Sequence, residues 1–178
     1  MKRIALTTGG TGGHIYPALA LAKEMRKKGY EVIFIGTSHR MEKEIVPKEK
    51  FKFYGLDILP FSSIKAVIKG IKAVFEIKKI LKNEKIDTVV GFGNYISIPT
   101  ILSAKLLGLN IYLQEQNIVM GKANKYCLPF AKKIFLAFGQ SLEQIKNKKK
   151  CVVTGNPLRQ EFYNITKEDA REILGIPK

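Results

Sequence analysis

The sequence has 178 residues, enough for one domain with a complete hydrophobic core and too few for two large domains. Lys and Arg number 31 against 15 Asp and Glu, a formal net charge of +16, which favours anionic partners such as nucleic acid, acidic membranes or phosphorylated substrates. Two cysteines without metal-ligand spacing indicate a reduced, cytosolic setting, and the first apolar run is far too short for a signal peptide. No segment approaches the roughly 18 apolar residues of a membrane span, so any membrane contact is expected to be peripheral.

Short β-rich runs alternate with helical patterns along the chain. The predicted strands are residues 3–8, 31–36, 51–58, 87–92, 110–115, 132–138 and 151–154. The predicted helices are residues 17–28, 41–48, 62–83, 96–107 and 122–128, and Gly29 and Gly108 follow two of them as C-caps. Residues 32–35 are apolar on both faces, as expected when helices cover both sides of a parallel sheet. The order predicts an α/β protein with a Rossmann-like, doubly wound parallel sheet.

A last helix is predicted near the C-terminus. A capping pattern opens it at Thr166, and Gly175 and Pro177 close it. We expect residues 1–163 to form one Rossmann-like domain and residues 164–178 to form a terminal helix and the start of a connection.

A glycine-rich turn, Gly-Gly-Thr-Gly-Gly-His at residues 9–14, follows the first predicted strand. Glycines let the chain turn sharply and let a ligand approach the amides, and the helix expected to start near Pro17 presents its positive end there. The spacing matches neither the dinucleotide fingerprint nor a P-loop. The turn therefore predicts a phosphate or acceptor site of another kind, with a tight turn that binds nothing as the alternative.

His14 ends this turn and is one of only two histidines. At a helix N-terminus the dipole disfavours the imidazolium form, and a neutral imidazole can accept a proton. This placement predicts a general base acting on a sugar hydroxyl, with a solvent-facing or capping histidine as the alternative. The second histidine, His39, is expected at the surface.

Residues 91–95 form a second glycine-containing turn between a predicted strand and a predicted helix. Two such turns at the carboxyl ends of parallel strands are expected to face one crevice. Four polar residues, 114–117, end the next strand and are interpreted as ligand-binding, with solvated loop residues as the alternative. Arg159, after the last strand, is suited to pairing with a phosphate or else lies in solvent.

The predicted helix at residues 62–83 combines apolar side chains at helical spacing with many lysines. Packing against the core with a solvated lysine face is the simplest interpretation. The alternative is docking on an anionic lipid surface, where each basic residue contributes about 1 kcal/mol. The residues expected to face the membrane are Phe61, Ile64, Lys65, Ile68, Lys69, Ile71, Lys72 and Phe75.

Taken together, these motifs resemble the MurG family, and the resemblance covers nearly the whole chain in order. The residues that carry it are Gly9, Gly10, Thr11, Gly12, Gly13, His14 and Pro17; Gly36, Thr37, Arg40, Met41, Glu42, Val46 and Pro47; Gly91, Phe92, Gly93, Asn94, Tyr95, Ser97 and Pro99; Glu115, Gln116 and Asn117; and Gly155, Asn156, Pro157 and Arg159. The family usually has a second glycine where Asn94 stands and histidine where Gln114 stands. Asparagine tolerates a left-handed backbone, so the turn at Asn94 is expected to survive.

The resemblance implies a fold and a reaction. The family fold is GT-B, two Rossmann-like domains with the active site between them, and this chain corresponds to the acceptor-binding N-terminal domain. The implied reaction is inverting transfer of N-acetylglucosamine from UDP-N-acetylglucosamine to the muramoyl 4-hydroxyl of lipid I, giving lipid II in peptidoglycan synthesis. It would take place at the cytoplasmic face of the bacterial plasma membrane, with the protein bound peripherally to an anionic surface.

The resemblance also implies roles for single residues. The base role falls on His14, with Glu115 as a second candidate. Substrate binding falls on Thr11, Gly12, Gly13, Tyr95, Gln116, Asn117 and Arg159. No acidic D-x-D cluster is present, so metal-independent chemistry without a cofactor is expected. The donor domain would lie beyond Lys178, so this chain alone is not expected to turn over substrate.

Three other functions compete with this one. Another GT-B transferase acting on a different lipid or glycan is the nearest. A non-catalytic lipid- or nucleotide-binding module is the second. A basic nucleic-acid-binding domain ranks last, because the lysines fall mostly on predicted helices rather than on a strand face among aromatics, so no nucleic-acid partner is expected.

Overall fold

The computed structural model of this protein describes residues 2–163 and 165–176. Within these residues the chain forms a seven-stranded parallel sheet in the order β3-β2-β1-β4-β5-β6-β7. The strands are β1 (Arg3–Thr7), β2 (Glu31–Thr37), β3 (Lys52–Leu56), β4 (Thr88–Gly91), β5 (Asn110–Glu115), β6 (Lys133–Leu136) and β7 (Cys151–Val153). The strand order reverses between β1 and β4, so this pair marks the point where ligands of open α/β sheets bind. The predicted doubly wound parallel sheet is confirmed.

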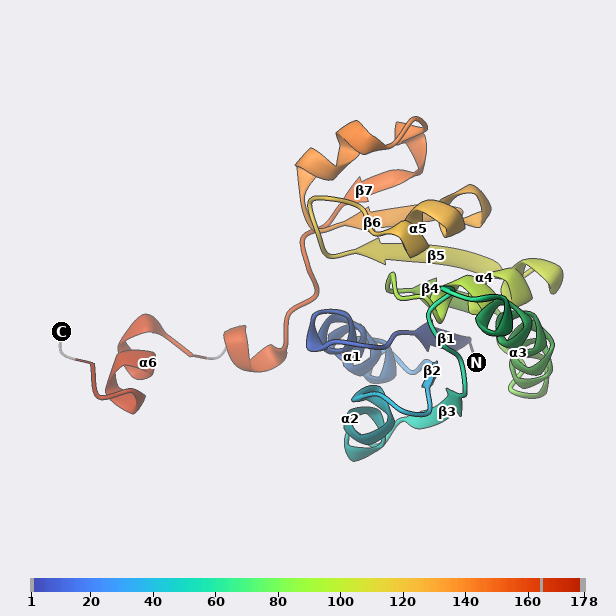
Figure 1. The fold of residues 1–178 in the computed structure, drawn as a ribbon. Helices are drawn as coiled ribbons and strands as arrows, with labels where there is room; N and C mark the ends of the chain where they lie inside the picture. Colours follow the sequence, from blue (N-terminus) through green and yellow to red (C-terminus); the bar gives the residue numbers. More distant parts are fainter. Residues whose placement is uncertain (1, 164, 177–178) are drawn as a thin grey trace.

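Helices cover both faces of the sheet (Figure 1). The α-helices are α1 (Gly12–Lys27), α2 (Glu42–Lys48), α3 (Ile64–Asn83), α4 (Ser97–Leu106), α5 (Lys122–Cys127) and α6 (Lys167–Ile173). Short 3₁₀ helices are η1 (Leu128–Phe130), η2 (Gly139–Gln144), η3 (Lys148–Lys150) and η4 (Gln160–Tyr163). Along β2, Ile33 and Ile35 join a core with α3, α4 and α5, while Phe34 joins a second core with α1 and α2. A strand buried on both faces accounts for its uninterrupted apolar sequence.

The predicted start of the first helix is wrong. The helix begins at Gly12, because the carbonyl of Thr11 accepts the amides of His14 at 3.1 Å and Ile15 at 3.2 Å and closes the first turn there. Pro17 therefore lies inside α1 and not at its start. The predicted C-caps are confirmed, since Gly29 and Gly108 adopt φ of +81° and +68°.

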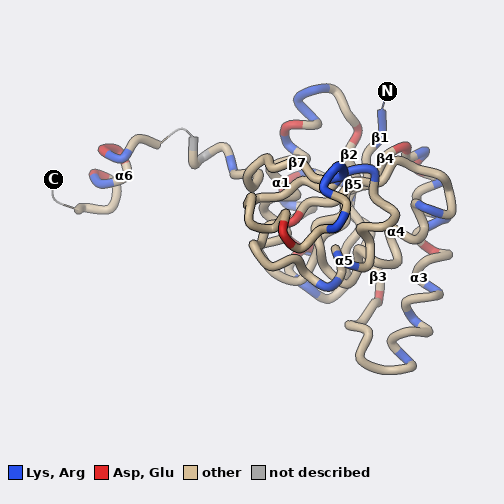
Figure 2. Tube along the Cα trace, turned by 90° about the horizontal axis from the view of Figure 1, so that it is seen from above, with Lys and Arg blue, Asp and Glu red and all other residues tan. Residues whose placement is uncertain are grey.

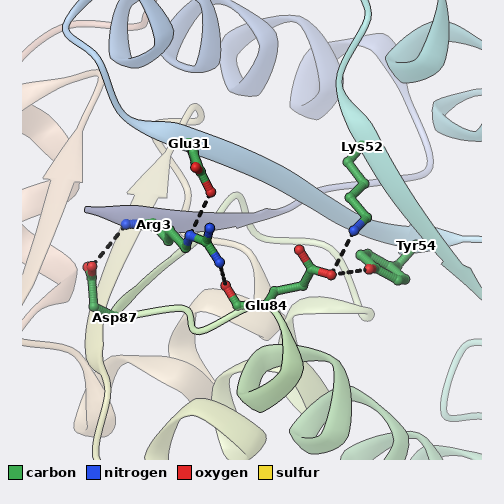
Figure 3. Close-up of polar contacts among 6 residues, drawn as sticks. All are labelled: Arg3, Glu31, Lys52, Tyr54, Glu84 and Asp87. Atoms are coloured by element: carbon green, nitrogen blue, oxygen red, sulfur yellow. Dashed lines mark hydrogen bonds and ion pairs between the residues drawn. The ribbon is translucent and has the colours of Figure 1, made fainter. Parts of the chain in front are cut away.

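A polar network joins the amino ends of four strands (Figure 3). Arg3 donates its backbone N–H to Asp87 at 2.9 Å and pairs its guanidinium with Glu31 at 2.6 Å. Glu84 accepts the Tyr54 hydroxyl at 2.6 Å and accepts the Arg3 guanidinium at its carbonyl oxygen. These bonds link β1, β2 and β3 to the connection between α3 and β4, at the end of the sheet opposite to the glycine turns.

The C-terminal segment leaves the sheet after β7. Figure 1 shows α6 standing away from the rest of the chain, while η4 lies beside α1, where Lys27 donates to Gln160 at 2.6 Å. The predicted capping box is confirmed, because Thr166 and Asp169 each accept the other's backbone amide. Pro177, expected to close this helix, lies outside the described residues.

Candidate active site

The glycine turn lies at the carboxyl end of β1, beside β4. Gly10 has φ of +89°, a conformation that favours glycine, and a Cβ on Gly9 would collide with the carboxylate of Glu42. Asn94, in the loop after β4, donates its side-chain amide to the carbonyl of Gly9. The two glycine turns therefore meet, as expected. The expectation that Asn94 adopts a left-handed backbone is wrong. Gly93 adopts it, with φ of +90°, and Asn94 contributes its side-chain amide to the turn.

The start of α1 presents open backbone amides. Thr11 is the N-cap residue but makes no side-chain capping bond. A Cβ on Gly13 would meet only Thr11 Oγ1, at an ordinary contact distance of 3.8 Å, and Gly13 has no positive φ. Neither packing nor backbone geometry demands glycine at this position. Access of an anionic ligand to the helix N-terminus supplies a physical reason for it.

His14 sits in the first turn of α1, half-buried. Its Nδ1 lies 3.1 Å from the hydroxyl of Thr11. Burial lowers the pKa of His14 from the ordinary value of 6.5, while the charge of Glu115 acts in the opposite direction. Burial is the larger of the two effects, so it favours the neutral imidazole near pH 7. In the tautomer in which Nδ1 carries the proton and donates to the Thr11 hydroxyl, Nε2 is the atom able to accept a proton.

A cavity of about 930 Å³ opens beside His14. Thr11, His14 and Tyr95 all line it, so the structure brings together three of the predicted site residues. The hydroxyl of Tyr95 is buried and has no hydrogen-bond partner within the described residues. Most of the remaining wall is apolar, formed by Phe61, Ile98, Leu102, Ala123, Tyr126 and Phe130. The cavity is polar beside His14 and apolar elsewhere.

A second, smaller groove of about 280 Å³ lies on the other side of the helix start. Gly12, Gly13 and Arg159 line it together, so three more predicted residues meet there. The Arg159 guanidinium lies 4.9 Å from the ring centre of Tyr16 and 5.1 Å from that of Phe162. Stacking on two rings holds a cation beside the open amides of α1.

Glu115 ends β5 and is 1 % exposed. One of its oxygens accepts the backbone and side-chain N–H groups of Asn117, both at 3.0 Å. The other accepts the backbone amide of Gly121 and the side-chain amide of Asn124, also at 3.0 Å. Four accepted bonds fill the lone pairs of a carboxylate. In this geometry Glu115 holds the loop between β5 and α5, and Asn117 is turned toward it.

The glutamines on either side of Glu115 form a chain of amides. Gln116 donates to the side chain of Gln114, which donates in turn to Asn156 Oδ1 at 3.2 Å. Gln114, where the family usually has histidine, thus ties the end of β5 to the segment after β7. Neither glutamine lines the cavity that contains His14.

Sequence reasoning gave no site role to three residues that the structure places at the site. Glu42 reaches the glycine turn, Asn94 bridges the two turns, and Lys122 lines the cavity beside His14. Glu42 and Asn94 lie in the motifs that carry the family resemblance, but nothing in their spacing shows that they contact the first turn. Lys122 opens a short helix and carries no sequence signal.

One face of α3 carries an apolar stripe that is not buried. Ile64 is 82 % exposed and Phe75 is 64 % exposed, and Val67, Ile68 and Ile71 lie between them on the same side. The buried residues of α3 are Ala66, Gly70, Ala73, Ile77 and Leu81, on the opposite side of the helix at about 100° per residue. Packing of the whole apolar face against the core is therefore excluded. Phe61 rests on Gly70, on the buried side of α3, where a Cβ would collide with its ring, and it also lines the cavity.

Comparison with known proteins agrees with this geometry. Residues 4–136 match the glycosyltransferase family 28 N-terminal domain. The chain is 48 % identical over 178 residues to the UDP-N-acetylglucosamine--N-acetylmuramyl-(pentapeptide) pyrophosphoryl-undecaprenol N-acetylglucosamine transferase of Fusobacterium nucleatum, covering 99 % of this chain and 50 % of that protein. It is 37 % identical over 184 residues to the protein of the same name from Halothermothrix orenii, with 99 % and 50 % covered.

A solved structure shows the same relationship. The crystal structure of Acinetobacter baumannii MurG superposes with a TM-score of 0.79 at 33 % identity, over 90 % of this chain and 47 % of that one. The chain thus spans about half the length of the relatives it matches. It belongs to glycosyltransferase family 28 and corresponds to the N-terminal domain of that family's MurG-type members.

Proposed function

We propose that this chain is the acceptor-side half of an enzyme that transfers N-acetylglucosamine from UDP-N-acetylglucosamine to the muramoyl 4-hydroxyl of lipid I, giving lipid II. One observation carries the proposal. The cavity beside His14 has mostly apolar walls, Phe61 among them, and the exposed stripe of α3 begins at Ile64, three residues after Phe61. A base at one end and an apolar surface at the other suit an acceptor that joins a sugar to a lipid. Membership of family 28 and the names of the relatives support the same substrate pair.

His14 is the proposed general base. Its Nε2 removes the proton from the muramoyl 4-hydroxyl as the oxygen attacks the anomeric carbon of the donor sugar. The bond from that carbon to the UDP oxygen breaks, UDP leaves with the electron pair, and the configuration inverts. Thr11, at 3.1 Å from Nδ1, orients the ring, and burial keeps it neutral.

The start of α1 is the proposed contact for the donor diphosphate. The amides of Gly12 and Gly13 and the stacked guanidinium of Arg159 place partial and full positive charges around one groove. Such charges stabilise the negative charge that grows on the leaving diphosphate. We assign residues 1–163 to the acceptor domain and residues 164–178 to the connection toward a donor-binding domain.

The stripe on α3 is the proposed membrane contact, at the cytoplasmic face of the bacterial plasma membrane. Figure 2 shows basic residues recurring along α3, which lies at one side of the chain. Lys65 and Lys72 flank the apolar residues, while Lys69 donates to Asp57 at 2.5 Å and is partly neutralised. No helix in the described part of the chain is long and apolar enough to cross a membrane.

The test uses the full-length protein with UDP-N-acetylglucosamine and lipid I. We expect His14→Ala to lower kcat by about 10²-fold or more. His39→Ala, which removes the exposed second histidine, is the matched control and should retain wild-type turnover. Near-normal turnover in His14→Ala would eliminate the base role. Binding of both ligands without turnover by the wild type would favour a non-catalytic module.

A further inference from the structure

Glu42 is a buried carboxylate that the proposed reaction does not use. It is the first residue of α2 and is 0 % exposed. Its Oε2 accepts the backbone amide of Gly10 at 3.1 Å. Its Oε1 accepts the backbone amide of Thr37 at 3.0 Å and the Thr37 hydroxyl at 2.6 Å. The side chain thus joins the end of β2 to the glycine turn after β1.

The surrounding backbone is shaped around this carboxylate. A Cβ on Gly9 would collide with its Oε1, and a Cβ on Gly36 would lie 2.7 Å from its Cγ. The three hydrogen-bond donors are all uncharged. Burying an ionised carboxylate is unfavourable unless its oxygens are hydrogen-bonded, so the site stays intact only while Gly10 and Thr37 hold their positions.

We infer that Glu42 is a positioning residue, which sets where α1 begins and so holds His14 and the open amides in place. The bond to Gly10 consumes the N–H immediately before the N-cap Thr11. Within the described residues the amides of Gly12 and Gly13 have no hydrogen-bond partner, and His14 follows in the same helical turn. A shift of Gly10 therefore moves the base and the anion site together.

Substitution by glutamine tests this with almost no change of shape. A glutamine has one accepting oxygen and one NH₂ group, which only donates. In one orientation of the side-chain amide the oxygen accepts from Thr37, and the NH₂ group then faces the N–H of Gly10. In the flipped orientation the oxygen accepts from Gly10, and the NH₂ group faces the N–H of Thr37. Either way two donors oppose each other, so one of the loops must move.

Asp87→Asn is the matched control. Asp87 also accepts a backbone amide of β1, that of Arg3 at 2.9 Å, but at the amino end of the strand, opposite to the glycine turn. Both substitutions replace a carboxylate that holds one end of the same strand. If Glu42 only stabilises the fold, the two variants should lose kcat to a similar extent. If Glu42 positions the site, Glu42→Gln should lose kcat and Asp87→Asn should not.

The inference rests on the proposed function, and the experiment separates the two. In the full-length protein, Glu42→Gln should lower kcat about 10- to 100-fold, because displacement of a catalytic group by about 1 Å has effects of this size. The KM for lipid I should change by less than about threefold, because the apolar walls that grip the lipid do not touch Glu42. Asp87→Asn should keep wild-type kcat.

Two further measurements keep the inference testable. Thr37→Val removes one donor to Glu42 while preserving shape, and a several-fold loss of kcat is expected even if Glu42→Gln does not fold. Amide hydrogen exchange at Gly10 should accelerate in Glu42→Gln and not in Asp87→Asn. Wild-type kcat in folded Glu42→Gln, or equal losses in Glu42→Gln and Asp87→Asn, would overturn the inference. A wild-type protein inactive on lipid I would overturn the proposed function instead, and hydrogen exchange would still test whether Glu42 holds the turn.

Discussion

The exposed stripe on α3 leads to a quantitative prediction for membrane binding. Phe75 exposes 64 % of a residue that can bury roughly 200 Å². About 130 Å² is therefore available to lipid, which is about 3 kcal/mol at about 25 cal/mol per Å². If half of that area enters the lipid, Phe75→Ser weakens binding by about 1.5 kcal/mol, or about tenfold. Phe138→Ser, which removes another exposed phenylalanine away from α3, should have no such effect.

The assay is sedimentation of the full-length protein with lipid vesicles, neutral or containing anionic lipid. Phe75→Ser should lose affinity for both kinds. Lys65→Gln combined with Lys72→Gln should lose about 2 kcal/mol on anionic vesicles only, and high salt should remove the difference. Equal binding of Phe75→Ser, Phe138→Ser and wild type to both vesicle types would refute the assignment of the stripe to the membrane.

Three further predictions concern the site. The acid limb of kcat/KM should lie below pH 6.5, because burial lowers the pKa of His14 and activity is lost as the pH falls through it; a limb above 6.5 in the pH–rate profile would contradict this. Glu115→Ala should lower the free energy of unfolding by about 3 kcal/mol, because four donors in and beside the loop between β5 and α5 lose their acceptor. Denaturant titration measures this, and an unchanged midpoint would show that Glu115 does not hold the loop. Lys122→Ala should raise the KM for lipid I several-fold, since this cation lines the cavity beside His14, whereas Lys125→Ala on the same helix should not.

The fold was predictable because its main signals are local. Apolar runs bounded by glycine identify the strands, and the seven predicted strands correspond to β1–β7 with ends shifted by a few residues. The start of α1 was missed because four glycines in six residues resemble a turn. What makes Gly12 helical is the acceptance of two amides by the Thr11 carbonyl, which propensity does not reveal.

The site was predictable only in part, because its parts come from distant segments. The glycine turn and His14 could be read locally. The Glu42 bond to Gly10 spans 32 residues, and the Asn94 bond to Gly9 spans 85, so neither leaves a pattern in the sequence. The apolar residues of α3 could be identified from their helical spacing. Their exposure could not, because it depends on which face of the helix packs on α4 and the sheet.

The arrangement of proton acceptors decides which side chain can act as the base. Glu42 accepts three hydrogen bonds and Glu115 accepts four, all from uncharged donors that hold loops around the site. Either carboxylate would have to release its loop before it could bind a substrate proton, and a buried donor left without an acceptor costs about 1–3 kcal/mol. His14 makes one bond, through Nδ1, and within the described residues its Nε2 has no partner. Proton removal at the imidazole would leave both loops in place, so we propose that the carboxylates hold the site's geometry and that His14 acts as the base.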